Sequence, residues 1–173
     1  MNFARVLQLI SDFFEGVNQP FAVIGALGLA TIGVSRATFD VDIVAPGEIQ
    51  GALVDFLESE GFRTEHRSTG YSNHVHSNEE LGRLDVVYIR GATAEQVFGG
   101  TEIKEGPGGV SLPVPRPEHL AAMKIFAIKN NPMRVLRDLD DVQCILNVPG
   151  VNRDEILSYF KKQGLEDLIE RLN

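Results

Sequence analysis

The spacing of hydrophobic positions changes several times along the chain, and each change marks a predicted element. Apolar residues three and four apart predict amphipathic helices, because such positions share one helix face. Alternating or short continuous apolar runs predict strands, and glycine and proline mark the ends of both. In chain order, the pattern predicts helices over 3–17, 26–32 and 48–60, strands over 21–24, 39–44, 62–67, 71–77, 84–89, 101–104 and 110–114, and helices over 118–130, 133–146, 152–162 and 165–172.

The order of these elements changes at a proline-rich segment, residues 113–117. Before it, helices and strands alternate, which predicts an α/β (α+β) fold with a mixed sheet of about five strands flanked by helices. After it, only helical patterns remain. We therefore expect a core over residues 1–114 and a C-terminal helical subdomain over residues 115–173.

Composition narrows the class of protein. The 173 residues suit one domain or one core with an appendage, and 43% of them are hydrophobic. A formal net charge of -8 argues against tight non-specific binding of nucleic acid, which requires many lysines and arginines. The chain has no run of eighteen apolar residues, no signal-peptide pattern, and one cysteine, too few for an internal disulfide. These features predict a cytoplasmic protein without a membrane span.

Three aspartates in predicted strands are the first candidates for chemistry. Asp40 and Asp42 lie two residues apart, so their carboxylates share one strand face, whereas Phe39 and Ile43 are expected to point into the core. Asp85 interrupts an otherwise apolar strand, and a buried acid needs a partner or a metal. Neighbouring carboxylates are costly unless they are neutralised, and Mg²⁺ prefers oxygen ligands. The pattern favours a site for Mg²⁺ or Mn²⁺.

The aspartates also have a structural interpretation. The first two could lie on a solvated strand face and the third could pair with an arginine, since a two-residue spacing alone is a weak motif. The upstream segment favours chemistry instead. A strand runs into Gly25 and a helix begins, so free N–H groups and a missing side chain would let a triphosphate approach the backbone. Arg36 and Thr38 lie on the way to the aspartates, where a guanidinium and a hydroxyl could meet phosphate.

In this order, the motifs resemble those of the minimal nucleotidyltransferases of the polymerase-beta superfamily, near the AbiEii-type toxins and the small antibiotic nucleotidyltransferases. The family pattern is an apolar residue, Gly, then Gly or Ser, a helix, and Arg-x-Thr-x-Asp-apolar-Asp. Here residues 24–26 read Ile-Gly-Ala and residues 36–42 read Arg-Ala-Thr-Phe-Asp-Val-Asp. Asp85 matches a third acid on a later strand, Lys124 matches a helical lysine, and residues 137–141 match a basic-Asp-x-x-Asp pattern. The match covers about two-thirds of the chain, by motif order.

The resemblance implies a nucleotidyltransferase-type fold and a Mg²⁺-dependent transfer of a nucleoside monophosphate from a nucleoside triphosphate to a hydroxyl. The acceptor would be an RNA such as tRNA, a protein or a small molecule. Ala26 replaces the usual Gly or Ser, and Arg137 replaces the usual lysine. The implied catalytic and metal-binding residues are Asp40, Asp42 and Asp85, and the implied nucleotide-binding residues are Gly25, Ala26, Arg36, Thr38, Lys124 and Arg137.

Two further expectations follow. A fold retained as a nucleotide sensor, an antitoxin or a partner-binding module, with a toxin–antitoxin partner protein, is the alternative to an enzyme. In either case the three carboxylates should converge on one cleft, and their repulsion should raise the pKa of at least one of them when no metal is bound. Asp138 and Asp141 have an equally good interpretation as salt-bridge partners.

Overall fold

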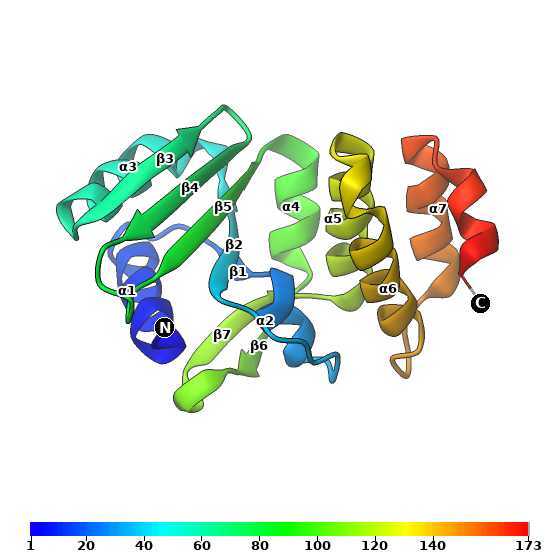
Figure 1. Cartoon of the computed structure of the whole chain (residues 1–173), viewed down its shortest axis with the longest axis horizontal. Coiled ribbons are helices and arrows are strands. Elements are labelled where there is room, and N and C mark those ends of the chain that lie inside the picture. The colour runs from blue at the N-terminus through cyan, green and yellow to red at the C-terminus, as the bar shows by residue number, and fades with distance from the viewer. Residues whose placement is uncertain (173) are drawn as a thin grey trace.

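The computed structural model describes residues 1–172, and a five-stranded mixed sheet in the order β1-β2-β5-β4-β3 is its main sheet (Figure 1). A separate hairpin, β6-β7, lies beside β1. The elements are α1 (Phe3–Gly16), β1 (Ala22–Val23), α2 (Gly25–Ala30), β2 (Asp40–Pro46), η1 (Gly47–Ile49), α3 (Gln50–Ser59), β3 (Phe62–Arg67), β4 (Tyr71–His76), β5 (Arg83–Ile89), α4 (Gly91–Gly99), β6 (Thr101–Glu105), η2 (Pro107–Gly109), β7 (Ser111–Pro115), α5 (Pro117–Asn130), η3 (Pro132–Arg134), α6 (Val135–Leu146), α7 (Arg153–Gln163) and η4 (Glu166–Arg171), where η marks a 3-10 helix.

The strand order brings the two aspartate-bearing strands together. β2 and β5 are parallel neighbours, and Asp42 lies opposite Asp85 in their register. The other pairs of the sheet, β1-β2, β4-β5 and β3-β4, are antiparallel. Because residues opposite each other on adjacent strands share a face, the two aspartates project from the same side of the sheet.

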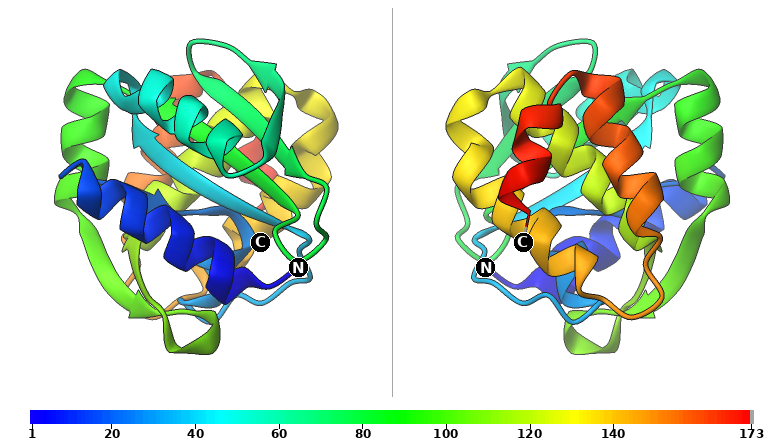
Figure 2. Two further views of the ribbon diagram at one scale, coloured as in Figure 1. Left: turned by 90° about the vertical axis from the view of Figure 1, so that its left-hand side faces the viewer. Right: turned by 90° about the vertical axis from the view of Figure 1, so that its right-hand side faces the viewer.

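Helices cover the sheet unequally. α1 and α3 pack together on one face, where the ring of Phe13 stacks on that of Phe56 with centroids 4.6 Å apart (Figure 2, left). Val41 and Ile43 of β2 are fully buried and are part of the core that these helices share. Burial of each such side chain contributes about 1.5–3 kcal/mol. The C-terminal helices α5, α6 and α7 stand side by side, away from α1 and α3 (Figure 1, right).

The predicted fold class is confirmed, and most predicted elements are present within a few residues of their expected bounds. The expectation that Phe39 points into the core is wrong: its side chain is 87% exposed, because β2 begins only at the next residue. α4 was not predicted, since Val97 is its one buried residue and a helical stripe needs several. The helix expected over 165–172 is a 3-10 helix.

The chain changes from mixed to all-helical structure where β7 ends and α5 begins, as the sequence predicts. The hydrophobic core is continuous across this point and includes Ile125, Val142 and Phe160 of the last helices. The division into two domains therefore stays a prediction. Among residues 1–172, no helix has the length and apolar character needed to cross a membrane.

Candidate active site

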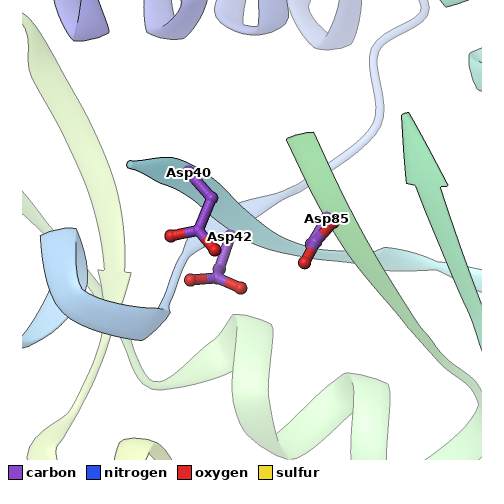
Figure 3. A group of neighbouring side chains, drawn as sticks. All are labelled: Asp40, Asp42 and Asp85. Atoms are coloured by element: carbon purple, nitrogen blue, oxygen red, sulfur yellow. The ribbon is translucent and has the colours of Figure 1, made fainter. Parts of the chain in front are cut away.

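Three carboxylates meet where β2 and β5 run side by side. Asp40 and Asp42 project from the same face of β2, and Asp85 lies beside them on β5 (Figure 3). Each offers one oxygen, and these oxygens all lie within 4.8 Å of one another. The prediction that the three side chains converge is confirmed. Alternation along β2 and the parallel register with β5 are sufficient to cause the convergence.

The electrostatics of this cluster fit a divalent cation. Burial, and to a smaller extent the negative charges of Asp40 and Asp85, raise the pKa of Asp42 to about 6, while Lys124 and Arg36 offset part of the shift. The direction of the shift agrees with the expected rise in at least one carboxylate pKa, but burial and not repulsion is its largest cause. A cation that binds several carboxylate oxygens would remove this repulsion, and the spacing of the oxygens suits Mg²⁺ or a similar ion after small side-chain movements.

Metal affinity should therefore depend on pH. A proton and a cation compete for Asp42, whose pKa is about 6. Below that pH we expect the affinity for Mn²⁺ to fall by about tenfold per pH unit, and above it to become constant. Calorimetric titration of Mn²⁺ between about pH 5 and pH 8 would measure this. An affinity that does not change over this range would contradict a role for Asp42 as a ligand.

Gly25 makes room for one of these carboxylates. Its φ is +59°, a conformation that L-residues rarely adopt, and a Cβ added there would lie 1.9 Å from Oδ2 of Asp42. The adjacent N–H of Ile24 donates to the backbone carbonyl of Asp42 at 2.9 Å. The sequence predicts that this glycine lets a triphosphate approach the backbone. The structure gives it a second function, because the carboxylate of Asp42 occupies the space of its missing side chain.

Replacing Gly25 with alanine should separate strain from a clash. The positive φ alone costs roughly 1–2 kcal/mol, and the clash should in addition displace Asp42. Gly91 is a matched control, since it also begins a helix, has a φ of +55°, and has nothing within 4 Å of the position that a Cβ would take. We expect both variants to lose stability in urea, but only Gly25→Ala to lose the stabilisation by Mn²⁺. Equal metal responses in the two variants would contradict the contact with Asp42.

Two other predicted residues lie close to the cluster. The hydroxyl of Thr38 donates a hydrogen bond to Oδ1 of Asp40, so it orients a carboxylate of the cluster. Ala26 is 2% exposed in the first turn of α2. The hydrogen bond of Thr38 and the burial of Ala26 do not test the predicted nucleotide-binding role of these residues.

A buried network of charges faces the cluster from α5 and α6. Nζ of Lys124 lies 2.7 Å from Oδ2 of Asp141 and 3.2 Å from Oδ1 of Asp138. Nε of Arg36 lies 3.4 Å from Oδ1 of Asp141, and Nε of Arg134 lies 2.6 Å from Oδ2 of Asp138. The interpretation of both aspartates as salt-bridge partners is confirmed. Because Lys124 and Arg36 also stabilise the charge of Asp42, the network places cations next to the carboxylates.

Arg137 lies at the edge of this network, and Arg134 lies nearer its centre. The side chain of Arg137 is 55% exposed, with Nε 3.7 Å from Oδ1 of Asp138. Burial lowers the pKa of Arg134, but Asp138, Asp42 and Tyr71 more than offset this and the net pKa is raised. Arg134 therefore faces the site, and the motif comparison missed it. Its four-residue spacing from Asp138 was the available signal.

Asp85 has partners of its own that the sequence did not identify. Its Oδ1 accepts hydrogen bonds from Nε of Arg83 at 2.9 Å and from Nδ2 of Asn73 at 2.6 Å. The hydroxyl of Tyr71 lies 3.5 Å from Oδ2. The alternative that this aspartate pairs with an arginine is therefore realised within the same cluster. Strand alternation places Arg83 and Asp85 on one face, but Asn73 and Tyr71 come from a different strand.

The mixed sheet, the glycine turn after β1 and the three carboxylates on adjacent strands together form a nucleotidyltransferase fold. Solved structures agree with this. The antibiotic-resistance factor ANT(2″)-Ia in solution matches over 99% of this chain and 97% of its own, with 17% identity and a TM-score of 0.71. Its crystal structure in complex with adenylyl-2″-tobramycin matches over 93% of this chain and 97% of its own, with 16% identity and a TM-score of 0.68.

A third structure belongs to the lincosamide antibiotic adenylyltransferase LnuA with bound lincomycin. It matches over 85% of this chain and 98% of its own, with 16% identity and a TM-score of 0.55. No protein-family model matches the chain, and no curated protein matches it by sequence. At these identities the likeness shows the fold, and the predicted resemblance is confirmed at that level.

Proposed function

We propose that the protein is a Mg²⁺- or Mn²⁺-dependent nucleotidyltransferase that moves a nucleoside monophosphate from a nucleoside triphosphate to the hydroxyl of a small molecule. The observation that carries the proposal is the cluster of Asp40, Asp42 and Asp85, whose oxygens lie within 4.8 Å of one another. Cations from α5 and from the segment before β2 face this cluster, as the charge of a triphosphate requires.

Asp40 and Asp42 would hold the cation and, through it, the triphosphate, while Asp85 would hold a second cation. When bound, such ions neutralise phosphate charge and activate the attacking oxygen. In the transfer, the acceptor oxygen forms a bond to the α-phosphorus, and the bond from that phosphorus to the bridging oxygen of the β-phosphate breaks. Pyrophosphate leaves with the electron pair, and Asp85 accepts the proton of the hydroxyl.

The remaining predicted residues would bind the nucleotide. Arg36 and Lys124 are already close enough to Asp42 to stabilise its charge, and we assign them, with Arg134, to the phosphates. Backbone N–H groups after Gly25, the hydroxyl of Thr38 and the exposed guanidinium of Arg137 would add donors around them.

The preference for a small acceptor has two supports. A net charge of -8 disfavours RNA, since a phosphate backbone needs a basic surface. Three of the matching structures belong to an antibiotic-resistance factor or to a lincosamide antibiotic adenylyltransferase, and two of these are described with an adenylyl product or adenylyl transfer. ATP is therefore the first donor to test. A toxin–antitoxin partner and a cytoplasmic location stay predictions.

The test uses purified protein with Mg²⁺ and each α-labelled nucleoside triphosphate, supplied in turn with small hydroxyl compounds, total RNA and lysate. A labelled small molecule and released pyrophosphate support the proposal, and Asp42→Asn is the inactive control. Labelled RNA or protein instead would contradict the choice of acceptor. Metal-dependent binding of triphosphate without any transfer would favour a nucleotide sensor, and no binding at all would contradict both functions.

A further inference from the structure

A polar sheet face extends from Asp85 toward the edge of the sheet. In the register of β3, β4 and β5, side chains that share a face with Asp85 come from every second position. The hydrogen bond from Asn73 to Asp85 confirms this alternation, as does the 6.0 Å separation between the rings of His66 and Tyr71. We call this surface the acceptor face. Its polar residues are Arg63, Glu65, His66, Tyr71, Asn73 and Arg83, and Val75 and Val87 share the face with them.

The ion pairs on the acceptor face join two arginines to two carboxylates. Nε of Arg83 lies 2.9 Å from Oδ1 of Asp85, and its Nη1 lies 3.8 Å from Oε2 of Glu65. Arg63 also contacts Glu65, with Nη2 2.8 Å from Oε1. One carboxylate, Glu65, thus faces two guanidiniums, while Asp85 belongs to the carboxylate cluster. The two arginines and two carboxylates balance in the metal-free protein, but once Asp85 holds a cation, as proposed above, Arg63 and Arg83 face Glu65 alone and positive charge is left over.

Arg83 is placed to contact an acceptor. Its side chain is 41% exposed, so part of the guanidinium reaches solvent while Nε is fixed by Asp85. Besides Nε, the guanidinium has a hydrogen bond with Tyr71 and a longer ion pair with Glu65, and its remaining N–H groups can donate to a carboxylate or a phosphate. The Asp85 carboxylate that holds Nε of Arg83 would also receive the proton of the acceptor hydroxyl. An anionic group of the acceptor that binds Arg83 would therefore lie within a few bonds of that hydroxyl.

We propose, on the basis of the function proposed above, that Arg83 selects acceptors in which a carboxylate or phosphate lies close to the reacting hydroxyl. When cations occupy the carboxylate cluster, a cationic acceptor would meet Arg83 and Arg63 instead of free carboxylates, and like charges at a recognition surface disfavour binding. Arg83 is thus a specificity-determining residue, in addition to orienting Asp85 together with Asn73.

The test is a binding titration followed by nuclear magnetic resonance of the Asn73 side-chain amide, which donates to Asp85. The protein is loaded with Mg²⁺ and α,β-methylene-ATP, so that the triphosphate site is filled and cannot take up the probes. Glycerol 3-phosphate and gluconate are the anionic probes and separate phosphate from carboxylate. Glucose is the neutral probe and tobramycin is the polyamine.

We expect saturable shifts with at least one anionic probe, at an affinity about tenfold or more above that for glucose and tobramycin. Arg83→Gln should weaken anion binding by about tenfold or more, and Arg83→Lys by less, because lysine keeps the charge and loses the fork. Arg153→Gln, an exposed arginine at the start of α7, is the matched control and should change nothing. A residue that only positions Asp85 would leave the ranking of the probes unaltered.

Three results would overturn the inference: tobramycin or glucose binding as tightly as the anions, no saturable shift with either anion, or unchanged anion affinity in Arg83→Gln. The titration with α,β-methylene-ATP itself separates the two proposals. If the analogue binds and the anions do not, only the acceptor inference fails. If the analogue does not bind with Mg²⁺, the proposed function fails and this inference fails with it.

Discussion

Replacing Asp42 with asparagine is expected to abolish nucleotidyl transfer while raising the stability of the metal-free protein. The loss of activity follows from the position of Asp42, which lies between Asp40 and Asp85 in the cluster and carries a buried, unfavourable charge (Figure 3). Without its negative charge, the affinity for the cation should fall sharply. We expect turnover to drop on the order of 10³-fold or more.

The gain in stability follows from the direction of the pKa shift. The pKa of Asp42 is about 6 in the folded protein, above its ordinary value of 3.8. An ionised Asp42 therefore lowers the stability of the folded state above pH 6, and this penalty disappears as the pH falls through 6 toward 4. Asparagine removes the penalty, so at about pH 7.5 the variant should be more stable by roughly 1–3 kcal/mol.

Urea unfolding with and without Mg²⁺, at about pH 7.5 and about pH 5, measures both effects. The wild type should gain stability from Mg²⁺ by mass action, and Asp42→Asn should not. Asp85→Asn is the informative comparison, because that carboxylate is already paired with Arg83 and its loss should bring no gain in metal-free stability. An Asp42→Asn variant that is less stable than the wild type at both pH values would contradict the account.

Much of this site could be predicted because it depends on local rules. Strand alternation puts Asp40 and Asp42 on one face, and the glycine turn after β1 marks where the chain can approach a ligand closely. Strand alternation also predicted that Phe39 points into the core, which is wrong because the strand begins only at the next residue. Alternation tells which residues share a face, but the residue at which a strand starts depends on its pairing with other strands.

What could not be predicted depends on contacts between distant segments. Asn73 reaches Asp85 only because β4 pairs with β5 in a particular register. The network around Lys124 joins two helices to the segment before β2, and spacing within either helix does not reveal it. α4 was missed for a different reason: it buries one side chain, Val97, so its sequence lacks the periodic stripe by which helices are identified.

The second large effect should come from Lys124, for structural reasons as well as functional ones. Lys124 is 7% exposed, Asp138 is fully buried and Asp141 is 3% exposed. Lys124→Met would keep most of the apolar stem but leave both aspartates without their shared cation. Removing one partner of a buried ion pair typically costs about 3–5 kcal/mol. Arg134 and Arg36 still contact the two aspartates in this variant, so we expect a loss at the lower end of that range.

Chemical denaturation of Lys124→Met should therefore show a loss of unfolding free energy in that range, and Lys129→Met, an exposed lysine on the same helix, should show almost none. Adding Asp138→Asn and Asp141→Asn to Lys124→Met removes the buried negative charges that the lysine compensated. This should recover part of the loss, although Arg134 and Arg36 then lose partners.

Acid should weaken the wild-type network as well. Burial alone would raise the pKa of Asp138, but Arg134 and Lys124 outweigh it, and the net pKa lies below the ordinary 3.8. The stability that this carboxylate contributes is therefore present above that value and is lost as the pH falls below it.

If Lys124→Met loses less than about 1 kcal/mol of unfolding free energy, the lysine is not the cation that compensates these carboxylates. Any loss of triphosphate binding in that variant would then report a direct contact between Lys124 and the nucleotide.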